Sequence, residues 1–72
     1  MTKKDVQNMF KKALYHACEK EQDAFIDGII ILPYQDIQSE LEFFDYGVDD
    51  FVDDFVENDE LVELWYRAVN DK

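Results

Sequence analysis

His16 and Cys18 are the two side chains of this chain best suited to nucleophilic or metal chemistry. A cysteine nucleophile needs a base within hydrogen-bond reach. Residues at i and i+2 of a helix, however, point about 160° apart. One histidine and one cysteine also cannot complete a zinc site. We therefore predict no catalytic residue, no metal site and no cofactor, with His16 at the surface and Cys18 as a small buried hydrophobic residue.

The acidic segment that begins at Asp45 has the composition of a calcium loop but not its spacing. An EF-hand loop needs glycine at its sixth position and glutamate at its twelfth. Counted from Asp45, these positions hold Asp50 and Val56. Hydrolysis of sugars by paired carboxylates needs a cleft for the sugar, and so small a domain has little room for one. We therefore expect a protein that is not an enzyme.

The stretch VDDFVDDFVEN, residues 48–58, segregates acids from bulky apolar residues and contains no cation. On a helix its five carboxylates fall within an arc of roughly 140°. They are Asp49, Asp50, Asp53, Asp54 and Glu57. Each like-charge i,i+4 pair costs about 0.2–0.5 kcal/mol, and interleaved lysines would relieve that repulsion. We interpret this face as a docking surface for a positively charged partner; the alternative is that it serves only solubility.

Further residues extend the expected partner-binding site beyond this segment. Glu60 adds a carboxylate, and Phe43 and Tyr46 are expected to supply apolar contact at the rim. Apolar residues cover more than half the circumference of the last expected helix, which includes Trp65 and Tyr66. Trp and Tyr are enriched at interface hot spots. These two rings are therefore expected in a partner or homodimer contact, unless so small a core needs both of them.

Charge is unevenly distributed along the chain, whose formal net charge is −11. Residues 1–24 hold five lysines and four acids, whereas residues 25–72 hold two cations and fourteen acids. An acidic surface repels nucleic acids and anionic membranes and attracts basic proteins. We therefore expect a basic protein partner and no direct binding to nucleic acid or membrane.

A nucleic-acid-binding protein is one class of partner that such a surface would suit. Duplex DNA carries one charge per about 1.7 Å of its axis, and carboxylates on successive helical turns could approximate such a row. In charge and size the chain is similar to DNA-mimic inhibitors such as the anti-restriction and anti-CRISPR proteins of phages. That resemblance implies an inhibitor or adaptor that occupies the basic groove of its target. The rival hypothesis is a small structural or oligomerising protein.

Composition and length predict one folded domain, residues 1–72. With 47 % hydrophobic and 15 % aromatic residues, the chain is too apolar for a disordered acidic tail. A single cysteine excludes an internal disulfide and fits a reducing compartment. No secretory leader is recognisable, and the longest apolar run, residues 29–32, is far shorter than a membrane span. We therefore expect a cytoplasmic protein.

The expected architecture is an all-α bundle of three to four short helices. Thr2 and Asp5 form a loose capping box for a first helix over residues 3–21. Gly47, able to take positive φ, marks a break before the acidic helix, and Asn58 is the expected N-cap of the last helix. The helices at residues 48–57 and after Asn58 could also form one bent helix.

The middle of the chain is ambiguous. Residues 24–32, AFIDGIIIL, are apolar except for Asp27 and favour either a buried helical or irregular segment or a buried strand. Residues 34–44 favour a helix after Pro33, although alternation at residues 37–43 also allows a hairpin over residues 25–43, which would make the fold α+β. The predicted core is Val6, Phe10, Leu14, Phe25, Ile29, Ile37, Leu41, Phe51, Phe55, Leu61 and Trp65.

Overall fold

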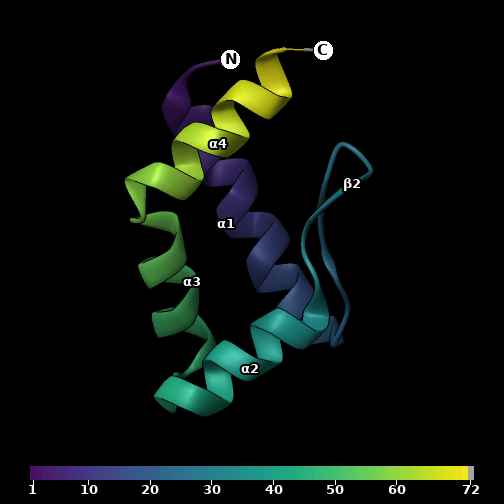
Figure 1. Ribbon diagram of the computed structural model, residues 1–72, viewed down its shortest axis with the longest axis vertical. Helices are drawn as coiled ribbons and strands as arrows, with labels where there is room; N and C mark the ends of the chain where they lie inside the picture. The colour runs from purple at the N-terminus through teal and green to yellow at the C-terminus, as the bar shows by residue number, and fades with distance from the viewer. Residues whose placement is uncertain (72) are drawn as a thin grey trace.

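The computed structural model describes residues 1–71 as four helices and one β-hairpin. In chain order the elements are α1 (Lys3–Lys20), β1 (Ala24–Ile26), β2 (Ile29–Leu32), α2 (Tyr34–Phe44), α3 (Val48–Val56) and α4 (Asp59–Asn70). The long helix α1 runs through the middle and contacts β1 and the other three helices. The helix α3 and the hairpin flank it on opposite sides, while α2 and α4 cross its two ends (Figure 1).

The helix α1 begins and ends where local sequence signals predict. The Thr2 hydroxyl accepts a hydrogen bond from the Asp5 N–H at 3.2 Å, and the Asp5 carboxylate accepts one from the Thr2 N–H at 3.1 Å. This reciprocal capping box satisfies two backbone donors at the helix start. At the other end Glu21 takes left-handed angles, with φ of 54°, and closes the last turn. The predicted first helix is thereby confirmed.

The structure corrects the all-α prediction, because residues 24–32 form an antiparallel hairpin. Asp27 and Gly28 form its two-residue turn, with φ of 53° and 78°. Two consecutive positive φ angles suit the right-handed twist of paired strands, and Asp-Gly is a preferred sequence for such a turn. The α+β alternative, with a hairpin over residues 25–43, was therefore closer to the structure. It extended the strands too far, because residues 34–44 are helical.

The hairpin covers α1 with only one of its two faces. Ala24, Ile26 and Ile31 are buried, whereas the cross-strand pair Phe25 and Ile30 is exposed. Successive side chains of a strand point to opposite faces, and no second layer covers the outer face. Phe25 lies on this outer face, whereas Ile29 is the partner of Ile26 beside the turn. The predicted burial of both was wrong: these side chains are 49 % and 46 % exposed.

The helix α2 follows the hairpin directly. The Asp23 carboxylate accepts a hydrogen bond from the Tyr34 N–H at 2.6 Å, which joins the base of the hairpin to the first turn of α2. At the C-terminal end Asp45 takes left-handed angles, with φ of 53°. Gly47 instead has φ of −72° and is the N-cap of α3, so the prediction of positive φ at Gly47 was wrong.

The acidic segment and the last segment are two helices rather than one bent helix. The Asn58 side chain accepts hydrogen bonds from the N–H groups of Glu60 and Leu61, at 3.1 and 3.3 Å. This is the predicted N-cap, and it starts α4 after a break at Glu57.

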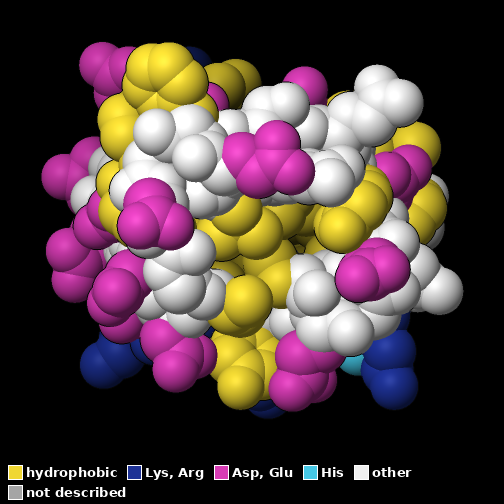
Figure 2. All heavy atoms as spheres, turned by 90° about the horizontal axis from the view of Figure 1, so that it is seen from below, with side chains coloured by type: hydrophobic (Ala, Val, Ile, Leu, Met, Phe, Trp, Pro, Cys, Tyr) yellow, Lys and Arg dark blue, Asp and Glu magenta, His cyan; other side chains and the backbone are white. Residues whose placement is uncertain are grey.

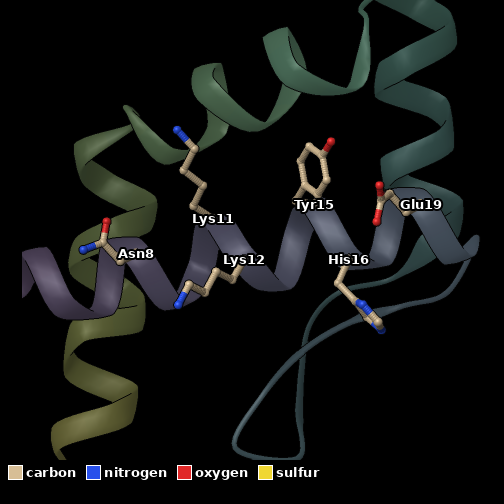
Figure 3. A pocket seen from close by; sticks show the side chains of 6 residues that line it. All are labelled: Asn8, Lys11, Lys12, Tyr15, His16 and Glu19. Atoms are coloured by element: carbon tan, nitrogen blue, oxygen red, sulfur yellow. The ribbon is translucent and has the colours of Figure 1, made fainter.

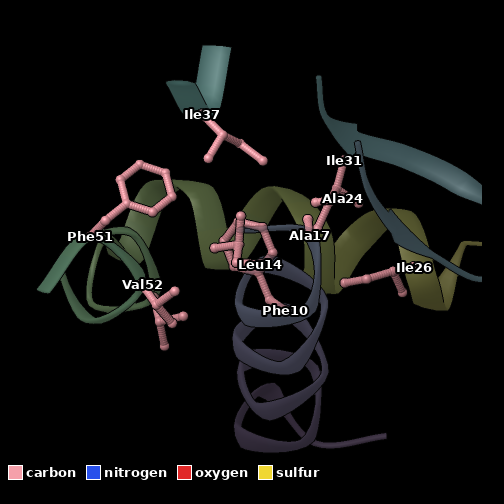
Figure 4. Packing of buried hydrophobic residues seen from close by; sticks show 10 residues of the cluster. Phe10, Leu14, Ala17, Ala24, Ile26, Ile31, Ile37, Phe51 and Val52 are labelled. Carbon is pink, nitrogen blue, oxygen red and sulfur yellow. The ribbon is translucent and has the colours of Figure 1, made fainter. Parts of the chain in front are cut away.

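The core gathers around α1. Side chains from the hairpin, α2 and α3 converge on Phe10 and Leu14 (Figure 4). Of the predicted core residues, five are fully buried: Val6, Phe10, Leu14, Ile37 and Phe51. Four are partly buried against the core: Leu41, Phe55, Leu61 and Trp65. Together with the four helices, the small sheet makes this a predominantly helical α+β domain.

Among the described residues, no helix has the length and apolar character needed to cross a membrane.

Candidate functional site

The helix α3 presents the predicted acidic face to solvent. Phe51, Val52 and Val56 are buried against the core, and Phe55 is half-buried beside them. Their spacing places them on one side of the helix, so the acids must lie on the other. The acidic face, Asp49, Asp50, Asp53 and Asp54, is exposed throughout. The helical prediction for this segment is therefore confirmed.

Two further predicted site residues lie at the junction of α3 and α4. Glu57 is exposed and is the C-cap of α3, so it lies just beyond the helical part of the acidic face. Glu60 is exposed in the first turn of α4, where negative charge is favourable at the positive end of the helix dipole. Their role in binding a partner stays a prediction.

One lysine of the chain reaches the acidic face. Lys11 Nζ lies 3.0 Å from Asp53 Oδ1, and both side chains are about half exposed. Exposed ion pairs of this kind contribute about 0–1 kcal/mol. Within residues 1–71, no lysine or arginine forms an ion pair with Asp49, Asp50 or Asp54. Most of this negative charge is therefore not neutralised by the protein itself.

Glu63 on α4 differs from the acids of α3 because it pairs with two cations. The Glu63 carboxylate is 3.3 Å from Lys3 Nζ and 3.5 Å from Arg67 Nε. Glu63 and Arg67 are four residues apart on the same helix, the spacing that places side chains side by side. Glu63 is thus held between two cations, whereas Asp49 and Asp50 on α3 form no ion pair with residues 1–71.

Tyr46 connects the acidic face to the core. Interaction of its hydroxyl with the Asp54 carboxylate is the main reason that the pKa of Tyr46 is raised above its usual value. Burial and the negative charges of Asp54, Glu40 and Asp50 act in the same direction. The ring of Tyr46 lies 6.3 Å from that of Phe51 in the core. The predicted position of Tyr46, at the rim of the acidic face, agrees with these contacts.

Trp65 and Tyr66 are both half-buried on α4. The Trp65 ring lies 6.0 Å from the Phe10 ring and packs against the core, so core packing accounts for this tryptophan. The Tyr66 carbonyl accepts a hydrogen bond from the Asn70 side chain. The most exposed apolar side chain of α4 is instead Leu64, at 62 %. A partner contact through Trp65 and Tyr66 stays a prediction.

His16 and Cys18 lie on α1 as expected for residues without a shared site. His16 is exposed, and Cys18 is half-buried, which raises the pKa of its thiol. A shallow depression on α1 is lined by Asn8, Lys11, Lys12, Tyr15, His16 and Glu19. Figure 3 shows Lys11 and Tyr15 pointing to one side of the helix, and Lys12 and His16 to the other. These side chains diverge, and residues 1–71 contain no group of three acids, histidines or cysteines placed to hold a metal ion.

The C-terminal end of α2 carries two exposed aromatic side chains. Phe44 is 53 % exposed and its neighbour Phe43 is 80 % exposed. Consecutive residues on a helix point about 100° apart, so a narrow apolar stripe cannot bury both. The pair Phe43-Phe44 at the end of an otherwise amphipathic helix was the signal that could have indicated an exposed aromatic surface.

Comparisons with protein-family models, with curated proteins and with solved structures match this chain to none of them.

Proposed function

We propose that this protein is a non-enzymatic inhibitor or adaptor that binds a basic protein through the acidic face of α3. The observation that carries the proposal is the exposure of Asp49, Asp50 and Asp54 with no ion-paired cation from residues 1–71. Asp53 and Glu57 contribute on the same segment, and Glu60 lies beyond the junction with α4.

The energetics of α3 support a role for this charge beyond solubility. Asp49–Asp53 and Asp50–Asp54 are like-charge i,i+4 pairs, each of which destabilises a helix by about 0.2–0.5 kcal/mol. Only Asp49 and Asp50 lie in the first turn, where the helix dipole favours acids. A cationic surface seated on this face would remove the repulsion, so binding and helix stability would reinforce each other.

The partner that best fits this chemistry is a nucleic-acid-binding protein. Its lysines and arginines are arranged to meet a row of phosphates, and a row of carboxylates can occupy the same groove. The protein would then compete with nucleic acid for that groove, acting as a DNA mimic without binding nucleic acid itself.

Salt-dependent capture tests the proposal. Immobilised protein should retain a basic partner from lysate at low salt and release it as ionic strength rises, because exposed charges are screened. Once the partner is identified by mass spectrometry, calorimetry should show at least about tenfold weaker binding to the variant Asp50→Asn, Asp53→Asn, Asp54→Asn, since three charge pairs near 0.5 kcal/mol each are lost.

A matched variant controls for loss of charge alone. Glu19→Gln, Glu21→Gln, Asp36→Asn removes the same number of exposed carboxylates from α1, its C-cap and α2. It should bind like the wild type. If both triple variants bind the identified partner as the wild type does, the acidic face is not the binding site.

A second candidate function rests on the outer face of the hairpin. Phe25 and Ile30 are about half exposed there, and an exposed apolar patch can mark a protein interaction site. In this alternative the protein is a structural homo-oligomer and its acids serve only solubility. Sedimentation distinguishes the two: a dimer dissociated by Phe25→Ser with Ile30→Ser supports the alternative, and a monomer at all concentrations excludes it.

A further inference from the structure

Three aromatic residues form an exposed surface beside the acidic face: Phe43, Phe44 and Tyr46, named here the aromatic corner. Phe43 and Phe44 meet edge to face, with ring centroids 4.7 Å apart and an interplanar angle of 79°. The Phe44 and Tyr46 rings follow at 5.4 Å. Phe43 is 80 % exposed, the most of any large hydrophobic residue described. Phe43 and Phe44 therefore add little to the core, whereas Tyr46 is partly buried against it.

The aromatic corner and the acidic face are parts of one surface. The Tyr46 ring packs on that of Phe44, and Tyr46 lies close enough to Asp54 of α3 for this carboxylate to raise its pKa. Figure 2, which views the molecule from the end where α2 lies, shows hydrophobic side chains both in the middle and at the margin of this face. Asp and Glu side chains lie among them, and Lys and Arg side chains lie only toward the edge of this view. Apolar patches with a polar rim are typical of protein interaction sites.

The charge around the aromatic corner determines what can occupy it. No lysine, arginine or histidine lies in the sequence between Lys20 and Arg67. Both α2 and α3 therefore offer carboxylates alone, including Glu40, Asp50 and Asp54 near the Tyr46 hydroxyl. The net charge of −11 disfavours a second copy of this chain there. A segment that is both cationic and able to stack on rings fits the surface.

Arginine is the side chain that meets both requirements. Its planar guanidinium stacks on aromatic faces, and its fork of N–H donors matches a carboxylate, whereas lysine presents a strongly hydrated point charge. We propose that the aromatic corner binds an arginine side chain of the basic partner, with Phe43 or Phe44 against the guanidinium plane and Asp50 or Asp54 accepting its hydrogen bonds. This inference rests on the proposed function and specifies the chemistry of the partner.

Two peptides of equal charge test the inference, hexa-arginine and hexa-lysine. Calorimetry at low salt should show tighter binding of hexa-arginine, by roughly two- to fivefold for each guanidinium stacked on an exposed ring. Amide shifts in NMR spectra should centre on Phe43, Phe44 and Tyr46 for hexa-arginine, and on the acids of α3 for hexa-lysine.

Variants of the aromatic corner separate stacking from charge. Phe43→Ser with Phe44→Ser should lower the affinity for hexa-arginine to that for hexa-lysine, while leaving hexa-lysine binding unchanged. Phe43→Leu with Phe44→Leu keeps the apolar area and should lose the same preference, which guards against misfolding as the cause. The control Phe25→Ser with Ile30→Ser removes similarly exposed apolar groups from the hairpin and should keep the preference.

The outcomes distinguish this inference from the proposed function. Equal binding of both peptides, or a preference that survives the serine and leucine variants, overturns the arginine site. The proposed function still stands in that case if the triple asparagine variant loses the identified partner. If the serine variant instead converts a dimer of this protein into a monomer, the aromatic corner is a self-association surface and the inference is wrong.

Discussion

The helices α1 and α3 contact each other but are stabilised in different ways. A capping box at Thr2 and Asp5 stabilises the start of α1, and a left-handed cap at Glu21 closes its end. The helix α3 has no side-chain N-cap and no basic residue in its last turn. Its last carbonyl, of Val56, instead accepts a hydrogen bond at 2.9 Å from the Gln7 side chain of α1.

This difference explains how an unfavourable acidic helix can exist in so small a domain. Short helices are marginal in water by themselves, and most helix stability in proteins comes from packing an apolar face. The three buried side chains of α3 and its contacts with α1 offset the repulsion among its acids. The helix α3 can therefore carry charge of one sign because α1 stabilises it from outside. It does so through apolar packing and through the Gln7 hydrogen bond to the Val56 carbonyl.

The largest expected effect comes from removing the packing of α3. Phe51 is fully buried and lies 4.4 Å, ring to ring, from Phe55. Phe51→Ala should cost about 3–5 kcal/mol, which is comparable to the whole stability of a domain of this size. Urea titration followed by circular dichroism measures the loss. Phe43→Ala, at an exposed position, should change stability by less than about 0.5 kcal/mol. Equal losses of stability in Phe51→Ala and Phe43→Ala would contradict the conclusion that packing of its buried side chains stabilises α3.

Removing the cap of α1 should have the next largest effect. Thr2→Ala deletes the side chain that accepts from the Asp5 N–H and should cost about 0.5–2 kcal/mol. The hydrogen bonds with Thr2, backbone first, lower the pKa of Asp5. Their contribution is therefore present above the unfolded pKa of Asp, about 3.9, and is lost as pH falls through the folded value. Thr2→Ser should retain both the stability and its acid dependence in chemical denaturation.

Gln7 tests whether α1 stabilises α3 from outside. Gln7→Ala removes the hydrogen bond to the Val56 carbonyl and should cost about 0.5–1.5 kcal/mol, because this contact is partly buried. The exposed neighbour Asn8 is the matched control, and Asn8→Ala should be close to neutral. Hydrogen exchange should rise at the C-terminal end of α3 in the Gln7 variant only. An unchanged exchange rate there would show that the bond does not stabilise α3.

A side-chain N-cap added to α3 should stabilise this helix and make its N-terminus more similar to that of α1. Gly47 is the N-cap with φ of −72°, and a Cβ there would meet only Asp50 at an ordinary 3.9 Å. Gly47→Ser should raise the free energy of unfolding by about 0.5–1 kcal/mol, through a side-chain cap and a less flexible unfolded chain. Thermal melts measure the gain. Destabilisation by serine would show that no side-chain cap forms at this position.

The smallest expected effect is a loss of stability at alkaline pH. It concerns Tyr46, which lies between the other rings of the aromatic corner and the acidic face. The pKa of Tyr46 is raised, chiefly by its interaction with Asp54, so the folded state holds this proton more tightly than the unfolded state. The resulting stability is present below the unfolded pKa, about 10, and is lost as pH rises through the folded value. The difference in tyrosinate absorbance between wild type and Tyr46→Phe should show that Tyr46 ionises at a higher pH than an ordinary tyrosine. In Asp54→Asn, Tyr46 should ionise at a lower pH than in the wild type. An unchanged pKa of Tyr46 in this variant would exclude the interaction with Asp54.

Several features of the fold could be read from the sequence because their causes lie within one or two helical turns. The capping box at Thr2, the N-cap at Asn58 and the segregated faces of α3 each depend on neighbouring residues, and each is found as predicted. The hairpin turn at Asp27-Gly28 was also readable, but the continuous apolar run around it concealed the turn signal.

The remaining features depend on contacts between distant parts of the chain. Periodicity could not tell which residues of the hairpin α1 would cover, so Phe25 and Ile29 were misplaced. Nor could it show that Lys11 reaches Asp53, or that Tyr46 joins the exposed Phe43 and Phe44 to Asp54. The sequence by itself determined where the acids and apolar side chains lie on each helix, because helical geometry is local. Only the tertiary structure decided which of those faces remain open to a partner, because burial depends on what the rest of the chain covers.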